Sequence, residues 1–168
     1  NSRMYVARQM YALRFGEVLP HRDIEVLRGM EGARVKAAYA KIAGEFGIEW
    51  QGRKYDRANP GAADLPNQAI NHASSAVRAA AAIAVMATAA IPQLGFVHED
   101  SSQAFILDVA DLYRDSTTLR IAFGAVRDMA LHDMSLERLV RRQANAVFAN
   151  EDVIPSMIER IKQMLAPP

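Results

Sequence analysis

Apolar residues recur every three or four positions along almost the whole chain, and this spacing constrains the fold more than any other feature. It places apolar side chains on one face of an α-helix. No stretch shows the repeated apolar–polar alternation that a substantial β-sheet requires. The sequence therefore predicts an all-α fold. We expect helices over residues 3–15, 23–46, 64–90, 103–114, 116–131, 135–149 and 151–165.

Composition narrows the class further. Half of the residues are hydrophobic, so residues 1–168 are predicted to form a single domain with a real core. Cysteine is absent, which excludes disulfides and thiolate metal sites and fits a cytoplasmic protein. The apolar segment 79–91 is shorter than the roughly 20 residues that a membrane span needs. We therefore interpret it as a buried helix and expect no membrane association.

One position breaks the apolar face of the helix expected over 23–46. That face consists of Ile24, Leu27, Glu31, Val35, Ala38 and Ile42. The spacing directs the Glu31 carboxylate toward the core, which is costly unless the group is neutralised, hydrogen-bonded or bound to a metal. Gly29 and Gly32 lie close on either side, and each weakens a helix interior by roughly 1 kcal/mol relative to alanine. We interpret them as allowing close backbone approach beside a functional carboxylate.

A second unusual segment is the expected helix 103–114, which is apolar over 105–113 except for Asp108 and Asp111. Because these residues are three apart, they share a helix face and need a positive partner, either an arginine or a metal. His98 lies in the connector just before this helix, from which it can fold back toward the two carboxylates.

Glu31, His98 and Asp111, with Asp108 beside them, form a mixed nitrogen and oxygen donor set. Such a set favours Mg²⁺ or Mn²⁺, ions that commonly serve phosphoryl transfer. Simpler interpretations stay open for each residue. Glu31 can pair with Arg28 or Arg34, His98 can be an ordinary hydrogen-bonded loop histidine, and the aspartates can cap a helix or pair with Arg114.

Net charge is only +1, but the charge is unevenly distributed. Residues 1–57 hold eleven Lys and Arg against seven Asp and Glu, whereas residues 58–168 hold nine against twelve. The candidates for phosphate contacts are Arg28, Arg34, Lys36, Arg53, Lys54 and Arg57. A further basic face, at Arg138, Arg141 and Arg142, is interpreted either as solvated surface or as a partner contact.

Six sequence blocks resemble one known family. They are LRFG (13–16), LRGMEGARV (27–35), GRKYD (52–56), NQAI (67–70), LGFVH (94–98) and LDVAD (107–111). Their order and spacing match the CRISPR spacer-acquisition integrase, the metal-dependent DNA endonuclease of the adaptation step, and in particular its type I-E branch.

This resemblance implies an architecture and a set of site residues. The family joins a small N-terminal β-domain to a large helical domain, and this chain resembles the C-terminal helical catalytic domain alone. The family's metal ligands match Glu31, His98 and Asp111. Asp108 matches an adjacent acidic position, and Tyr55 matches a tyrosine near the catalytic pocket.

The resemblance also implies an activity and partners. The 3′-hydroxyl of a captured DNA fragment would attack a phosphodiester at the edge of a CRISPR repeat, and the same site would cleave branched DNA. The expected partners are double-stranded DNA (spacer precursor and repeat), a second copy in a homodimer, and a small companion protein. Two alternatives are a non-catalytic DNA- or partner-binding module whose acidic residues form salt bridges, and a metal-dependent hydrolase of another phosphate ester.

Overall fold

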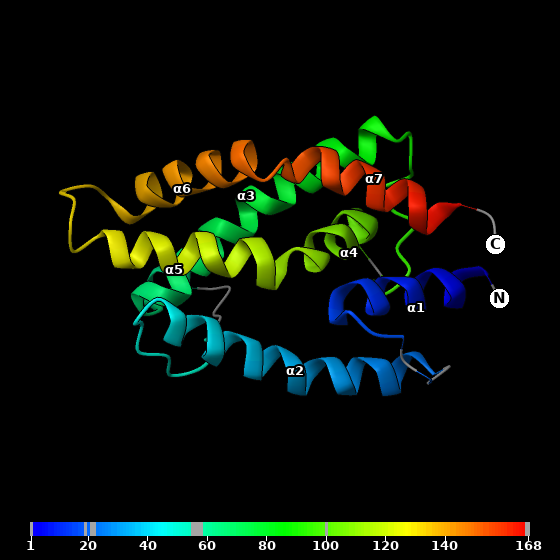
Figure 1. The fold of residues 1–168 in the computed structure, drawn as a ribbon, viewed down its shortest axis with the longest axis horizontal. Helices are drawn as coiled ribbons and strands as arrows, with labels where there is room; N and C mark the ends of the chain where they lie inside the picture. Colours follow the sequence, from blue (N-terminus) through cyan, green and yellow to red (C-terminus); the bar gives the residue numbers. More distant parts are fainter. Residues whose placement is uncertain (1, 19, 21–22, 55–58, 100, 167–168) are drawn as a thin grey trace. The chain divides into compact units, whose positions relative to one another are not determined.

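The computed structural model describes residues 2–18, 20, 23–54, 59–99 and 101–166. Helices account for all the regular structure in these ranges, which confirms the all-α prediction (Figure 1). In chain order the elements are α1 (Ser2–Phe15), α2 (Ile24–Glu45), the 3₁₀ turn η1 (Pro60–Ala62), α3 (Leu65–Ala87), α4 (Ala104–Leu112), the π-helical turn η2 (Arg114–Thr118), α5 (Leu119–Asp128), α6 (Leu136–Asn150) and α7 (Val153–Leu165).

Helix ends follow local sequence signals. The Asp64 carboxylate accepts a hydrogen bond of 3.0 Å from the Asn67 backbone N–H and so caps the start of α3. Ser135 caps α6 in the same way, because its side chain accepts from the Arg138 backbone N–H. Gly47 follows α2 with a φ of 68°, a left-handed conformation that ends helices and favours glycine.

The connection between α4 and α5 differs from the expected pair of helices over 103–114 and 116–131. A π-helical turn, η2, joins the two helices instead. Such a turn forms hydrogen bonds from residue i to i+5, a pattern that apolar spacing does not encode. The prediction that this region is helical was therefore correct, but the π-helical turn was not predicted.

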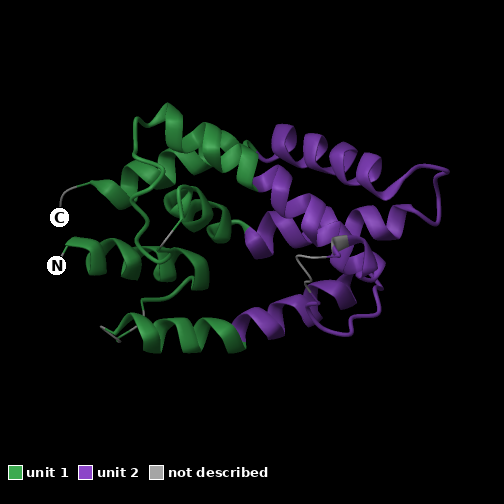
Figure 2. Ribbon diagram, turned by 180° about the vertical axis from the view of Figure 1, so that it is seen from behind, with its two compact units in different colours: residues 1–33, 78–113, 152–168 green, residues 34–77, 114–151 purple. Residues whose placement is uncertain are grey.

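The chain divides into two compact units, each assembled from separate segments (Figure 2). Unit 1 comprises residues 1–33, 78–113 and 152–168, and unit 2 comprises residues 34–77 and 114–151. The single domain expected over residues 1–168 stays a prediction.

In unit 1, α1 contacts both α4 and α7. Helix α7 contributes a fully apolar face to the core, consisting of Val153, Met157, Ile161 and Met164. Helix α4 is apolar nearly all round, as expected of a buried helix, and carries Asp108 and Asp111. These contacts fix α4 beside α1, where the candidate site forms.

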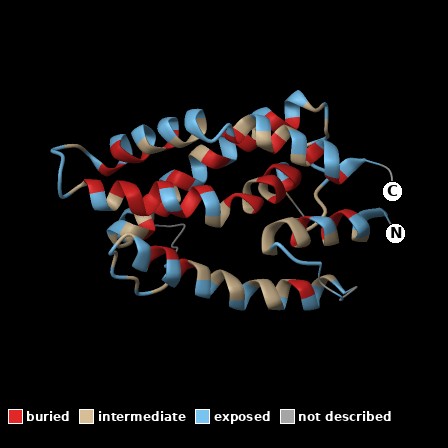
Figure 3. Cartoon of the chain, in the orientation of Figure 1, coloured by how far each residue is buried: buried red, intermediate tan, exposed pale blue. Residues whose placement is uncertain are grey.

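In unit 2, α5 contacts α6 and the turn η2. Most positions of α5 are buried, as Figure 3 shows. Trp50 links two parts of this core, since its ring lies 5.3 Å from the Tyr39 ring and 5.7 Å from the Phe123 ring, measured between centroids.

Among the described residues, none of the helices combines the length and the apolar character needed to cross a bilayer.

Candidate metal centre

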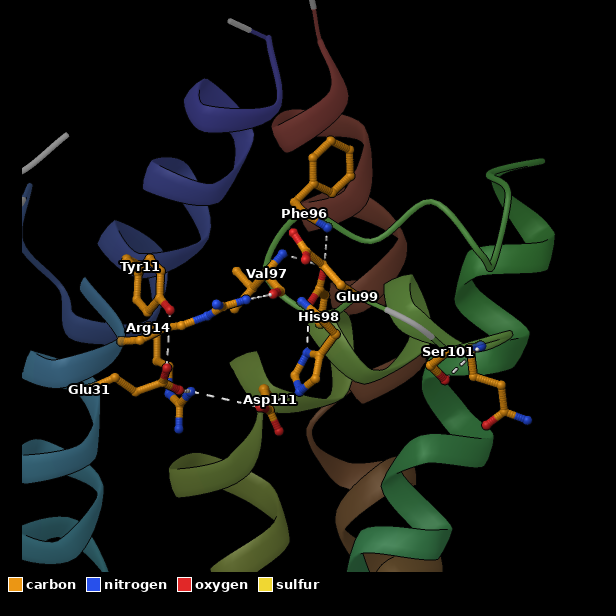
Figure 4. Close-up of polar contacts among 12 residues, drawn as sticks. Tyr11, Arg14, Glu31, Phe96, Val97, His98, Glu99, Ser101 and Asp111 are labelled. Carbon is orange, nitrogen blue, oxygen red and sulfur yellow. Dashed lines mark hydrogen bonds and ion pairs between the residues drawn. The ribbon is translucent and has the colours of Figure 1, made fainter. Parts of the chain in front are cut away.

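The site is built on a small apolar cluster in unit 1. Tyr11 of α1 and Leu27 of α2 are buried together, and Phe15, Met30 and Val97 pack against them. This packing brings the last turn of α1, the first turns of α2 and the 96–98 loop together. Polar side chains from all three elements, and from α4, meet beside the cluster (Figure 4).

Glu31 occupies the apolar face of α2, as its spacing predicted, and its side chain is 18% exposed. One carboxylate oxygen, Oε1, forms an ion pair with Arg14 Nη1, and the other, Oε2, accepts a hydrogen bond of 3.2 Å from the Tyr11 hydroxyl. Burial raises the pKa of Tyr11, so this hydroxyl stays protonated and continues to donate.

The pairing suggested from spacing was with Arg28 or Arg34. Instead, Glu31 pairs with Arg14 of another helix, while Arg28 contacts Glu25 and the Val97 carbonyl. Helical spacing identifies only neighbours on the same helix, and this contact depends on how α1 packs against α2.

Asp108 organises the loop before α4. Its side chain is completely buried, and its two oxygens accept backbone hydrogen bonds from Phe96 (2.6 Å), Val97 (3.1 Å) and His98 (2.8 Å). Three consecutive amides therefore converge on one carboxylate. The opposite side of the loop is also held, because the Val97 carbonyl accepts a bond from Arg28 of α2.

The same carboxylate orients the His98 ring. Asp108 Oδ1 lies 2.7 Å from His98 Nδ1. Because a carboxylate can only accept, Nδ1 carries the proton, so Nε2 is the ring atom that has a lone pair whenever the ring is neutral. Nε2 lies 3.8 Å from Asp111 Oδ2, so His98 folds back onto α4 and presents a potential ligand atom beside Asp111. A carboxylate behind a histidine is the usual outer support of a metal ligand.

Asp111 also faces the cavity, and unlike Asp108 it accepts no backbone hydrogen bond from the 96–98 loop in the described contacts. Its Oδ2 lies 4.0 Å from Arg14 Nη1, the same nitrogen that pairs with Glu31. The cavity has a volume of about 20 Å³ and is lined by Met10, Tyr11, Arg14, Glu31, Val97, His98, Asp108, Asp111 and Leu112. A space of this size holds about one water molecule or one ion.

The donor types are those that hard divalent ions take, because two carboxylates and one imidazole line a cavity about the size of one ion. Within the described ranges, no three acidic or histidine side chains are close enough together to hold a metal ion in this arrangement. The guanidinium of Arg14 lies between the two carboxylates in this arrangement.

Comparison with known proteins identifies the family. The model of the family described as CRISPR associated protein Cas1 matches residues 5–163. The chain belongs to the Cas1 family. A CRISPR-associated endonuclease Cas1 of Methanospirillum hungatei is 35% identical over 164 residues, covering 97% of this chain and 54% of the relative. The Escherichia coli K12 endonuclease Cas1 is 35% identical over 165 residues, covering 98% and 53%. The chain thus spans about half the length of these relatives.

Solved Cas1 structures have the same fold. A crystal structure of a TtCas1–DNA complex superimposes with a TM-score of 0.87 at 33% identity, covering 96% of this chain and 59% of that one. A second crystal structure, of TtCas1, gives a TM-score of 0.82 at 32% identity, covering 99% and 62%.

The two glycines beside Glu31 face open space in the described structure, so the close approach expected there stays a prediction. Each is exposed on α2, and a Cβ added to Gly29 or Gly32 would meet no described atom within 4 Å. Close packing occurs instead at Gly95, where an added Cβ would lie 2.6 Å from Ala104 Cβ and would also clash with the His98 carbonyl oxygen. The loop before α4 therefore requires glycine at position 95.

The basic residues proposed for DNA contact lie in both units. Arg28 belongs to unit 1, and Arg34, Lys36, Arg53 and Lys54 belong to unit 2. Arg53 donates to Asn67 Oδ1 (2.8 Å) and Asn71 Oδ1 (2.6 Å). Buried Asn67 also accepts from the Lys54 backbone N–H (2.9 Å), so one asparagine fixes this basic loop on α3. Tyr55 and Arg57 lie outside the described residues.

Sequence reasoning assigned no site role to Arg14 or Tyr11. The signal was present, because Ala7, Met10 and Tyr11 form the buried face of α1 and Arg14 follows at the same helical spacing. A charged residue on that face has the same significance as Glu31 on α2. The Arg14 side chain is in fact only 6% exposed.

Proposed function

We propose that this chain is the helical catalytic region of a metal-dependent Cas1 endonuclease and integrase of the type I-E branch, which inserts new spacers into a CRISPR array. One observation carries the proposal: Glu31, Asp111 and the Nε2 face of His98 line one ion-sized cavity. Membership of the Cas1 family and the fold shared with a Cas1–DNA complex support it. The 35% identity to the Escherichia coli relative supports the choice of branch.

Glu31, His98 and Asp111 would hold Mg²⁺ or Mn²⁺ in this proposal. The bound ion would act as a Lewis acid that stabilises charge on the phosphate and on the attacking or leaving oxygen. Asp108 would act from behind, as a positioning residue that keeps the Nδ1 proton in place and Nε2 directed at the cavity. Tyr11 would fix the Glu31 carboxylate by its hydrogen bond to Oε2.

The proposed reaction is a transesterification on DNA. The 3′-hydroxyl of a spacer precursor attacks the phosphodiester at the repeat edge, so one P–O bond forms as another breaks. The hydroxyl proton is released, and the repeat strand leaves with a free 3′-oxygen that takes up a proton. The same machinery would cleave branched DNA.

The proposed macromolecular partners are double-stranded DNA, a second Cas1 copy and a small companion protein, in the cytoplasm. Phosphate contacts are proposed for Arg28, Arg34, Lys36, Arg53 and Lys54. The crystallised TtCas1–DNA complex supports DNA as the partner, and the sequence resemblance supports the other two.

Glu31→Gln is the decisive variant, because it removes the charge and keeps the shape. We expect Mn²⁺ binding, followed by electron paramagnetic resonance, to be lost. Cleavage of branched DNA by the full-length protein should fall at least about 100-fold. Glu45→Gln is the matched control, since Glu45 lies on the same helix and pairs with exposed Arg120 at 3.1 Å. Wild-type Mn²⁺ affinity in Glu31→Gln would contradict the proposed site.

A second candidate function is favoured by the ion pair between Glu31 and Arg14. In a non-catalytic DNA- or partner-binding module, this pair would serve only to stabilise the fold. Glu31→Gln would then lower stability, and any activity would follow the folded fraction. Unchanged circular dichroism with abolished cleavage would exclude this candidate.

A further inference from the structure

Arg14 occupies the place where the acidic pocket needs a positive charge. Its Nη1 forms an ion pair with Glu31 Oε1 and lies 4.0 Å from Asp111 Oδ2. In Figure 4 the Arg14 side chain reaches across from α1 toward Glu31, with Asp111 beyond. The guanidinium is almost entirely buried, so its charge is compensated by these carboxylates rather than by bulk water.

A divalent ion cannot share this position with the guanidinium. Arg14 Nη1 contacts Glu31 Oε1 and lies 4.0 Å from Asp111 Oδ2. Oxygen ligands approach Mg²⁺ to about 2.1 Å, so an ion bound to Glu31 Oε1 and to Asp111 would lie within a few ångströms of the present position of Arg14 Nη1. Two cations at that separation in a buried pocket repel strongly. An ion bound to both carboxylates would therefore compete with Arg14 for Glu31.

We propose that Arg14 is a removable counter-ion of the acidic pocket: it holds Glu31 and Asp111 in the metal-free chain and is displaced when a divalent ion binds them. This inference rests on the proposed metal site and adds a regulatory element to it. Arg14 is the penultimate residue of α1, and Gly16 follows with a φ of 70°. The side chain therefore lies at a helix end, where it can leave the pocket without breaking a helix interior.

This replacement of the Arg14 guanidinium by a divalent ion, called the exchange below, has a thermodynamic consequence. The ion pair stabilises the metal-free state alone, so it lowers metal affinity by the same factor by which it stabilises that state. Removing Arg14 should make the metal-free chain less stable and Mn²⁺ binding tighter. The two changes should match in size.

The test compares Arg14→Gln with wild type by Mn²⁺ titration, followed by electron paramagnetic resonance, and by urea unfolding with and without Mn²⁺. We expect Mn²⁺ to bind at least tenfold more tightly to Arg14→Gln. The stability difference seen without metal should close at saturating Mn²⁺. Lys162→Gln is the matched control, because Lys162 lies on α7 of the same unit and pairs with Glu159 at 2.6 Å in solvent, away from the 96–98 loop. It should leave Mn²⁺ affinity unchanged.

Arg14→Lys covers the case in which Arg14→Gln does not fold without metal. Lysine keeps the charge but lacks the planar fork of donors, so its Mn²⁺ affinity should lie between those of wild type and Arg14→Gln. Folding of Arg14→Gln on addition of Mn²⁺ would also support the exchange.

Two results would overturn the proposal, and they differ in what else they affect. If wild type binds Mn²⁺ but neither Arg14 variant binds it more tightly, the exchange is wrong and the proposed function stands. A stability difference that persists at saturating Mn²⁺ has the same meaning. If wild type binds no Mn²⁺ at this pocket, the exchange and the proposed function both fail.

Discussion

Two buried aspartates, Asp108 in unit 1 and Asp128 in unit 2, are satisfied in different ways. Asp108 accepts hydrogen bonds from three consecutive backbone amides and faces the His98 ring. Asp128 accepts only from side chains in its described contacts, namely those of Arg127, Arg142 and Gln143. Backbone N–H groups are fixed by the path of the main chain, so Asp108 determines the shape of the 96–98 loop and the orientation of the His98 ring. Side-chain donors can rotate to other partners, so Asp128 joins α5 to α6 without changing the path of the backbone.

The largest expected effect comes from removing the loop-shaping carboxylate. Asp108→Ala leaves three amides and the His98 ring without their acceptor, so we expect a loss of about 3 kcal/mol in the free energy of unfolding. Asp128→Ala should cost only about 1 kcal/mol, because the Arg127 and Arg142 side chains, 55% and 44% exposed, can return to water. Urea unfolding measures both.

Metal binding sharpens the same contrast. Mn²⁺ affinity should fall about 10- to 100-fold in Asp108→Ala and stay unchanged in Asp128→Ala. Equal losses of stability in the two variants would show that backbone and side-chain donors are equivalent here. Equal Mn²⁺ affinities in the two variants would show that Asp108 does not position His98 for metal binding.

Periodicity predicted most of the fold because each helix contributes a regular apolar face to a core. The same pattern drew attention to Glu31 as a charge on such a face. It could not assign different roles to Asp108 and Asp111, which are three residues apart on one helix. Their roles diverge because the 96–98 loop folds over Asp108, and that path depends on tertiary contacts with Arg28 and on the close packing at Gly95.

Other features were missed for different reasons. Arg14 lies on the buried face of α1, and the argument applied to Glu31 would have identified it. The π-helical turn η2 has no such signal, because its hydrogen-bond register does not alter the apolar spacing. The close approach expected at Gly29 and Gly32 stays a prediction, since both glycines face open space and spacing alone does not show what would come near them.

A smaller effect is expected in the pH dependence of unit 2. Burial raises the pKa of Asp128. Hydrogen bonds from Gln143 and Arg127, together with the nearby positive charges, lower the pKa by more than burial raises it, so the net pKa is below 3.8. A depressed carboxyl pKa stabilises the fold above the unfolded pKa of about 4, and that stability is lost as pH falls through the folded pKa. In Asp128→Asn, stability should therefore decline less steeply below about pH 4. Parallel curves for wild type and variant, measured by urea unfolding between pH 2 and pH 6, would contradict this assignment.

The smallest effect should have the opposite sign and tests the glycines beside Glu31. Gly29→Ala and Gly32→Ala each place a Cβ on an exposed helix position with no atom within 4 Å, so each should stabilise the fold by about 0.5–1 kcal/mol. Gly44→Ala, on the same helix in unit 2, should do the same. Branched-DNA cleavage by the full-length protein then separates the positions. If a DNA backbone approaches beside Glu31, the first two variants lose activity while gaining stability and Gly44→Ala keeps its activity. If all three variants keep full activity, Gly29 and Gly32 have no role in cleavage. The close approach expected beside Glu31 is then wrong.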